Sequence, residues 1–176
     1  SPTLTAGLEG VREYMSGYPY VCLEQQTSKA VALKDKAMWQ DITRRLPEYI
    51  DTDGLLKFFP SCRYGSDILT AYVLSISHQA GFGIPAYLKD RMVSGLEGFV
   101  DGSIRHQYPV GAPDLTIRKI AALEALSRYQ AIEPARLASV DIQPNFLPTS
   151  AVVDWLLVLY RSTALPDRDR RYAEAQ

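Results

Sequence analysis

The chain is poor in the residues on which metal sites and disulfide frameworks depend. It has two cysteines and two histidines in 176 residues, and they form no cluster with the spacing of a metal site. The net charge is −1 and the isoelectric point is near 6.1, which gives no electrostatic reason to expect nucleic acid as a partner. A glycine-rich phosphate loop is absent, and no apolar run reaches the roughly 18–20 residues of a membrane span. We therefore expect no cofactor, no metal and no insertion of this segment into a membrane.

The residues that are present are typical of a helical globular domain. Hydrophobic residues make up 47% of the chain and charged residues 22%, which is close to ordinary globular usage. Apolar residues recur at three- and four-residue steps almost throughout, whereas no stretch alternates with the period of a strand. The sequence therefore predicts an all-α fold of helical hairpins packed side by side.

Caps and helix-breaking residues predict where the helices begin and end. The predicted helices cover about 23–33, about 35–46, the stretch from a cap at Ser66 or Asp67 to Gly81, Pro85 to Gly102, a stretch capped by Asp114, a stretch opened by Pro148, and a last one from Pro166. In the helix after Pro148 we expect Val153, Leu156, Leu157 and Tyr160 to face the core.

The most informative stretch is Cys22-Leu23-Glu24-Gln25, which places a thiol and a carboxamide three residues apart at a predicted helix start. Residues at i and i+3 of a helix have β-carbons about 5–6 Å apart, so the Cys22 sulfur can reach the side-chain carbonyl carbon of Gln25. A helix N-terminus favours the thiolate that would attack there. Loss of ammonia would leave an internal thioester, an acyl group activated for transfer to an amine or a hydroxyl.

Such a thioester survives only where water is excluded, and three tyrosines nearby are candidates for an apolar shield. They are Tyr14, Tyr18 and Tyr20. The main alternative is that Cys22 is a buried, unreactive thiol, since free cysteine packs as a small hydrophobe. A disulfide between Cys22 and Cys62 would exclude the thioester, and only Cys22 stands in a motif, so we interpret Cys62 as structural.

The segment around this pair resembles a known motif. The string 18–28, Tyr-Pro-Tyr-Val-Cys-Leu-Glu-Gln-Gln-Thr-Ser, resembles the thioester motif of the alpha-macroglobulin and complement superfamily, in the form common in bacterial alpha-macroglobulins. Residues 7–14 resemble the lead-in helix of that domain, and 66–72 resemble its recurrent Leu-Thr-Ala-Tyr helix. The stretch 53–56, Asp-Gly-Leu-Leu, departs from the Asp-Gly-Gly-Phe of many relatives. After about residue 110 only a general helical-hairpin pattern is shared.

The resemblance implies that residues 1–176 are a thioester domain, part of an α/α toroid in which hairpins form two concentric rings. Roughly eight helices are predicted from the periodicity, so we expect an incomplete piece of a toroid from a larger multidomain protein. The implied parent is a broad-range proteinase inhibitor of bacterial defence, in the periplasm and anchored to the inner membrane. Cleavage of its bait region would expose the thioester, which then acylates the proteinase. Its partners would be proteinases and other domains of the parent, and because capture happens once, the protein would not be an enzyme.

Other residues leave alternatives open. His106 resembles, in approximate position, a histidine that takes over the acyl group in some complement proteins, whereas His78 is expected to complement a helix C-terminus. Asp51 and Asp53 suggest either a glycosidase pair or, more simply, a turn. Cys22 with His106 would suit a cysteine acyltransferase. A helical scaffold in which the thioester no longer forms is the remaining alternative.

Overall fold

The computed structural model describes residues 5–19, 21–104, 111–140, 142 and 147–162. This part of the chain contains eight α-helices, and its only β-type pairings are two isolated bridges, Ile50 to Leu56 and Leu56 to Ser66. The helices are α1 (Thr5–Ser16), α2 (Leu23–Leu33), α3 (Lys36–Tyr49), α4 (Asp67–Ala80), α5 (Ala86–Val100), α6 (Ala112–Ser127), α7 (Pro134–Ala138) and α8 (Thr149–Arg161). The prediction of an all-α fold is confirmed.

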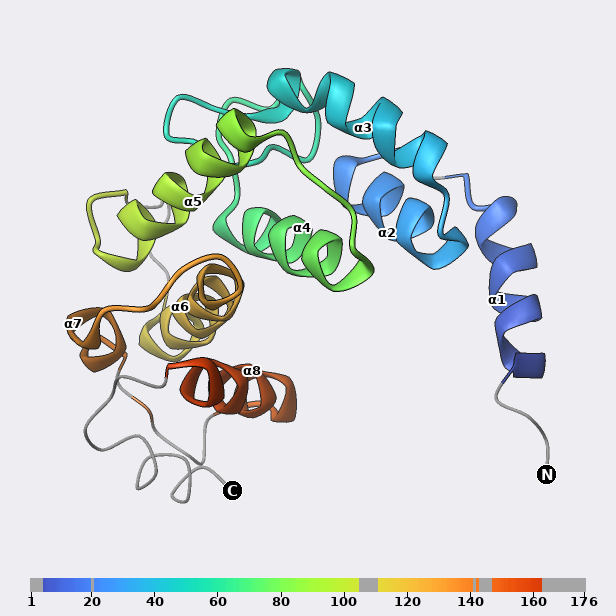
Figure 1. The fold of residues 1–176 in the computed structure, drawn as a ribbon. Coiled ribbons are helices and arrows are strands. Elements are labelled where there is room, and N and C mark those ends of the chain that lie inside the picture. Colours follow the sequence, from blue (N-terminus) through green and yellow to red (C-terminus); the bar gives the residue numbers. More distant parts are fainter. Residues whose placement is uncertain (1–4, 20, 105–110, 141, 143–146, 163–176) are drawn as a thin grey trace.

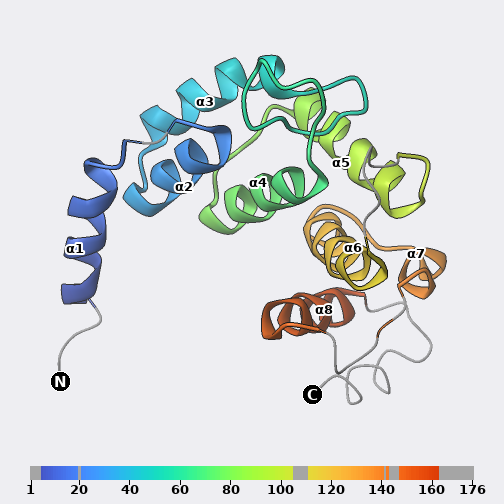
Figure 2. The same cartoon turned by 180° about the vertical axis from the view of Figure 1, so that it is seen from behind.

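The helices form two rows along an open arc (Figure 1). α2, α4, α6 and α8 pack one against the next and make the inner row, and α3, α5 and α7 lie outside it. The view from behind shows the same order, with α1 packed on α2 at one end of the arc (Figure 2). Inner and outer helices therefore alternate along the chain, as the hairpins of an α/α toroid require.

One hydrophobic core runs through both rows. Its largest side chains, with less than 2% of their surface exposed, come from inner and outer helices alike and from the loop between α3 and α4: Leu23, Leu46, Leu56, Leu69, Leu74, Leu88, Met92, Leu96, Ile120, Leu123, Leu126 and Leu137. An inner helix buries one side against the outer row and both flanks against its inner neighbours. This is why α4 and α6 are apolar over most of their circumference.

Local signals explain several of the helix boundaries. α2 spans the predicted 23–33, and in α4 the Ser66 hydroxyl accepts a bond from the Leu69 N–H at 3.3 Å, while Gly81 ends the helix with φ 69°. Pro85 is the N-cap of α5 rather than its first helical residue.

Two further predictions about helix boundaries were wrong, and one short helix was missed. α3 does not stop near Leu46, because it continues through Pro47 to Tyr49. Gly111, not Asp114, is the N-cap of α6, and Asp114 lies in the first turn, where its charge favours the helix dipole. The short helix α7 was not predicted, and the helix predicted from Pro166 lies outside the described residues.

The prediction for the inward face of α8 was also wrong. Ala151, Trp155, Val158 and Leu159 are buried, whereas Val153 is 49% exposed and Tyr160 is 69% exposed. Leu156 and Leu157 are half-buried. α8 is apolar almost all round, so the 3.6-residue period alone does not select the side that meets α6.

Polar side chains also join the inner helices. The Asp67 carboxylate at the start of α4 is fully buried and accepts two bonds from the Arg118 guanidinium of α6, at 2.7 and 3.0 Å. A buried carboxylate left without such a partner would be strongly destabilising, so this pair fixes how α4 lies against α6.

Glu124 plays the same part between α4, α6 and α8. It is 4% exposed and accepts bonds from Ser75 at 2.8 Å, Arg128 at 2.9 Å and Arg161 at 2.8 Å. Burial would raise the pKa of Glu124, but these donors together outweigh burial and hold the pKa below its ordinary value. The charged carboxylate is therefore the form that the folded inner row stabilises.

Candidate functional site

Cys22 and Gln25 stand at the N-cap and third positions of α2. Cys22 has extended backbone angles (φ −68°, ψ 159°) and is 8% exposed. The Gln25 side-chain oxygen turns back and accepts a bond from the Cys22 backbone N–H at 3.3 Å. This is the geometry of a capping box, in which a glutamine at the third position satisfies an unpaired N–H at the helix start. The predicted helix start is therefore where the structure has it, and the carboxamide lies against the cysteine.

The neighbouring Gln26 is held in another direction. Its side-chain oxygen accepts a bond from the Arg45 guanidinium of α3 at 2.7 Å, and its amide donates to the Val21 carbonyl. Of the two adjacent carboxamides, Gln25 therefore faces Cys22, while Gln26 fixes the backbone just before it. This role of Gln26 and Arg45 could not be predicted from local patterns, because the contact joins two helices.

The loop between α3 and α4 supports the start of α2. The Leu23 N–H, the first of the helix, donates to the Phe58 carbonyl at 3.0 Å. Such an N–H has no partner within its own helix, so the loop takes the place of a side-chain cap. Phe58 and Phe59 are 38% and 44% exposed on this loop. Helical periodicity could not identify this loop as a support for the motif.

Asp51 organises that loop. One of its carboxylate oxygens accepts bonds from the Asp53 and Leu55 N–H groups at 3.0 and 2.9 Å, and the other accepts from Gly65 at 2.6 Å. Gly54 has φ 87°, and a β-carbon there would lie 2.3 Å from the Arg91 carbonyl oxygen of α5. Asp51 is therefore engaged as a turn residue, as its Asp-Thr-Asp-Gly context suggests, and not as one of a free carboxylate pair.

Two further side chains of α2, Ser28 and Lys29, hold this helix in place. The Ser28 and Tyr72 hydroxyls lie 2.7 Å apart and join α2 to α4. Lys29 donates to the Ser16 carbonyl at 3.0 Å and to the Tyr18 carbonyl at 3.4 Å, so it ties the segment before the motif to the side of α2. The motif is thus fixed by contacts with α1, α3, α4 and the loop 50–66.

The structure describes two of the three tyrosines predicted to shield the thioester. Tyr14 is 66% exposed, and its ring packs on that of half-buried Tyr18 with centroids 5.6 Å apart. Tyr20, the third member, lies outside the described residues, and so does His106. The shielding role of the tyrosines and the acyl-transfer role of His106 stay predictions.

His78 and Cys62 are the other candidates that the structure describes. The His78 ring, near the end of α4, meets the Tyr129 ring edge-on with centroids 5.2 Å apart. Both cysteines are free, Cys22 buried and Cys62 half-buried. Within the described residues no three His, Cys, Asp or Glu side chains are grouped so that they could hold a metal ion.

The arrangement suits acyl chemistry on the Gln25 carboxamide. The thiol of Cys22 and the carboxamide belong to one helix start, and the Cys22 N–H points at the oxygen on which negative charge would develop when the carbonyl carbon is attacked. A donor in that position stabilises such charge before the reaction begins. The site therefore offers a nucleophile, an electrophile and an oxygen-stabilising donor within four residues.

Comparison with models of protein families and with curated proteins finds no match for this chain. Two solved structures are similar. One is a crystal structure of native alpha-2-macroglobulin from Escherichia coli, spanning domain MG7 to the C-terminus, with TM-score 0.76 and 17% identity over 96% of this chain. The other is a cryo-EM reconstruction of the native conformation of the same E. coli protein, with TM-score 0.74 and 18% identity over 96% of this chain.

These similarities define the fold class of the chain. It is an all-α domain of paired inner and outer helices, and it has the fold of part of E. coli alpha-2-macroglobulin. The chain spans 30% of the crystallised segment and 12% of the longer chain. At the level of the fold this agrees with the resemblance carried by the motif at 18–28. Among the described helices, none combines the length and apolar character that crossing a membrane requires.

Proposed function

We propose that this chain is the thioester domain of a bacterial alpha-macroglobulin-like proteinase inhibitor. The observation that carries the proposal is the bond from the Cys22 N–H to the Gln25 side-chain oxygen, which holds the carboxamide against the cysteine. The fold shared with part of E. coli alpha-2-macroglobulin supports it independently. A scaffold without the thioester would have no need of a cysteine at this cap, where serine, threonine, aspartate or asparagine stabilises a helix better.

The proposed bond forms between the Cys22 sulfur and the Gln25 side-chain carbonyl carbon. The thiolate attacks that carbon, the carbon–nitrogen bond breaks, and the nitrogen leaves as ammonia with the proton of the thiol. A lysine amine of a proteinase later attacks the same carbon, an amide forms, and Cys22 leaves as thiolate. Each molecule reacts once, so the process is nucleophilic acyl transfer without turnover.

Leu23 and Glu24 complete the four-residue motif with separate tasks. Leu23 is 1% exposed and anchors the first turn in the core, whereas Glu24 is exposed in that turn, where a negative charge complements the helix dipole. We expect Phe58, whose carbonyl accepts a bond from the Leu23 N–H, to help keep water from the acyl carbon. In the proposed parent this surface would be completed by other domains.

The wider setting follows from the same proposal. The parent protein would lie in the periplasm, anchored to the inner membrane, and its partners would be proteinases that cut a bait region in another domain. His106 would take over part of the exposed acyl group and so add hydroxyls to the lysine amines as acceptors.

The direct test is the intact mass of untreated protein. A thioester makes the chain lighter by one ammonia. Methylamine should add its own mass at position 25, which leaves the chain one CH2 heavier than its sequence, and should release one thiol for each such molecule. Cys22→Ala and Gln25→Ala should both abolish the mass deficit, whereas Cys62→Ala and Gln40→Ala, outside the motif, should retain it. Full mass in protein prepared without amines, with Cys22 open to a thiol reagent from the start, would contradict the proposal.

A further inference from the structure

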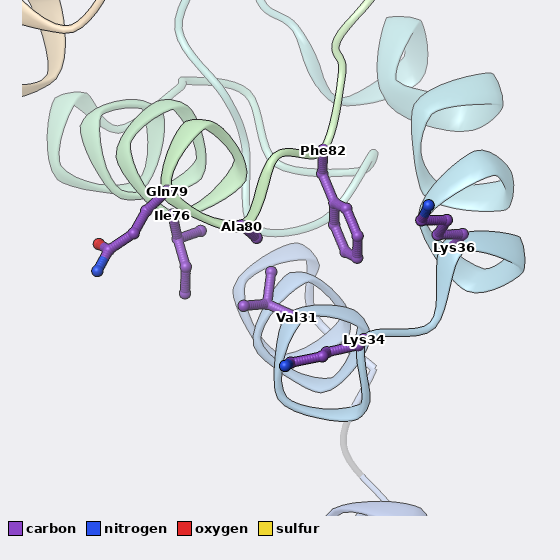
Figure 3. Close-up of a pocket in the computed structure, with 7 residues that line it drawn as sticks. All are labelled: Val31, Lys34, Lys36, Ile76, Gln79, Ala80 and Phe82. Atoms are coloured by element: carbon purple, nitrogen blue, oxygen red, sulfur yellow. The ribbon is translucent and has the colours of Figure 1, made fainter.

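A pocket lies at the far end of α2 from the motif. It has a volume of about 560 Å³, within the roughly 300–1,000 Å³ typical of small-molecule sites. Its lining comes from the ends of α2 and α4, the start of α3 and the residues that follow α4: Val31, Lys34, Lys36, Ile76, Gln79, Ala80 and Phe82. Figure 3 shows Ile76 and Phe82 pointing toward the end of α2, where Val31 and Lys34 lie, with Lys36 at the start of α3.

The apolar wall of this pocket is held rigidly. The Phe82 ring packs on the Trp39 ring of α3 with centroids 5.5 Å apart, and the Trp39 ring N–H donates to the Gly83 carbonyl at 2.7 Å. Both rings are buried, with Trp39 4% and Phe82 9% exposed. A preformed wall of this kind spares a ligand the entropic cost of ordering side chains.

Two lysines, Lys34 and Lys36, provide the positive charge among the lining residues. Among the described residues, neither Lys34 nor Lys36 is in an ion pair. Asp35 stands between them, but its carboxylate caps α3 by accepting a bond from the Met38 N–H at 2.9 Å. The α2 carbonyls of Val31 and Ala30 accept bonds from backbone N–H groups, at 3.0 and 2.8 Å, and so need no ammonium.

Lys34 stands where a glycine would fit better. It ends α2 with φ 53° and ψ 34°, the one non-glycine residue with positive φ in the described part of the chain. α4 ends beside it in the same left-handed conformation, and there the residue is Gly81, with φ 69°. A side chain in this conformation is strained, whereas glycine is not. The cost at Lys34 is the kind of local strain that clusters at binding sites.

We propose that this pocket binds an amphipathic organic anion, with its apolar body against Val31, Ile76 and Phe82 and its carboxylate between Lys34 and Lys36. The apolar wall selects the body, because burying it removes hydrocarbon surface from water. The two ammonium groups select the sign of the head group. The pocket is separate from the motif at Cys22, so this proposal does not depend on the thioester.

Decanoate is a suitable probe, compared with decyltrimethylammonium of the same chain length and kept below micelle-forming concentrations. Trp39 reports on the pocket through its contact with Phe82, and Trp155→Phe removes the other tryptophan signal. We expect saturable quenching or shift of Trp39 emission with decanoate. Lys34→Gly and Lys36→Gln should each weaken binding by about fivefold, the effect of losing one partly exposed charge pair. Lys89→Gln, on α5, should leave binding unchanged.

Lys34→Gly separates a binding role from a structural one. If the lysine serves ligand binding, glycine should raise the unfolding temperature of the free protein and yet lower decanoate affinity. The proposal is overturned if decanoate does not bind, if decyltrimethylammonium binds equally well, or if Lys34→Gly leaves affinity unchanged. Binding only of acidic peptides that carry an apolar side chain, with no response to decanoate, would also overturn it and identify a polypeptide site.

Discussion

At the scale of single residues, two adjacent glutamines at the start of α2 have different hydrogen-bond partners. Gln25 bonds to the Cys22 N–H, and Gln26 links the Val21 carbonyl to Arg45 of α3. The first contact brings together the groups of the proposed thioester. The second holds the backbone from which Cys22 projects, so Gln26 is a positioning residue for the proposed bond.

Gln26→Ala should therefore lower the fraction of molecules that lack ammonia, although Cys22 and Gln25 are both present. The loss of two partly exposed hydrogen bonds should reduce the free energy of unfolding by only about 1 kcal/mol. Intact mass measures the first effect and urea unfolding the second. Gln40→Ala, an exposed glutamine of α3, is the matched control. An unchanged thioester yield in Gln26→Ala would show that the cap at Gln25 positions the cysteine by itself.

At the scale of helices, local signals predicted some boundaries well and failed where a contact joins distant parts of the chain. Ser66 and Gly81 bound α4 as predicted, because capping is decided within four residues. The bond from Leu23 to the Phe58 carbonyl crosses from one element to a loop, and no periodic pattern encodes it. The position of the motif at the start of α2 was therefore predictable, and its supports were not.

The face of α8 gives an element-scale prediction. Leu159 is fully buried, and Val153 is 49% exposed. The helical period had predicted that Val153 faces the core. Leu159→Ala should cost about 2–5 kcal/mol of unfolding free energy. Val153→Ala should change it by less than about 0.5 kcal/mol, as exposed substitutions do. Urea unfolding followed by circular dichroism measures both. An equal cost for the two would mean that Val153 faces the core after all.

At the scale of the whole molecule, the inner row depends on a charged glutamate. The pKa of Glu124 is lowered in the folded protein, despite burial, by bonds from Arg128, Arg161 and Ser75. Its contribution to stability is therefore present above the unfolded-state pKa and lost as pH falls through the folded-state value. Asp154 of α8 behaves oppositely, because burial and then the charge of Glu124 raise its pKa.

Two variants should consequently move stability in opposite directions at neutral pH. Glu124→Gln should lower the free energy of unfolding by about 2 kcal/mol, since it weakens bonds to buried donors, and should flatten the decline in acid. Asp154→Asn should raise stability at neutral pH, because it removes a charge that folding disfavours, and the gain should shrink as pH falls. Urea unfolding at several pH values between neutral and about pH 3 measures both curves. Parallel curves for Glu124→Gln and the unchanged protein would exclude the proposed coupling.

The capping box at Cys22 and Gln25 affects both the formation and the loss of the proposed bond. Because the cap already holds the carboxamide against the cysteine, ring closure starts from a high effective molarity and loses little further entropy. After reaction, position 25 would carry a glutamate or a substituted amide, and either keeps an oxygen that can accept the Cys22 N–H, as a capping box allows. The helix can therefore begin in the same way before, during and after capture. The proposed acyl transfer is irreversible, but it does not require the domain to refold.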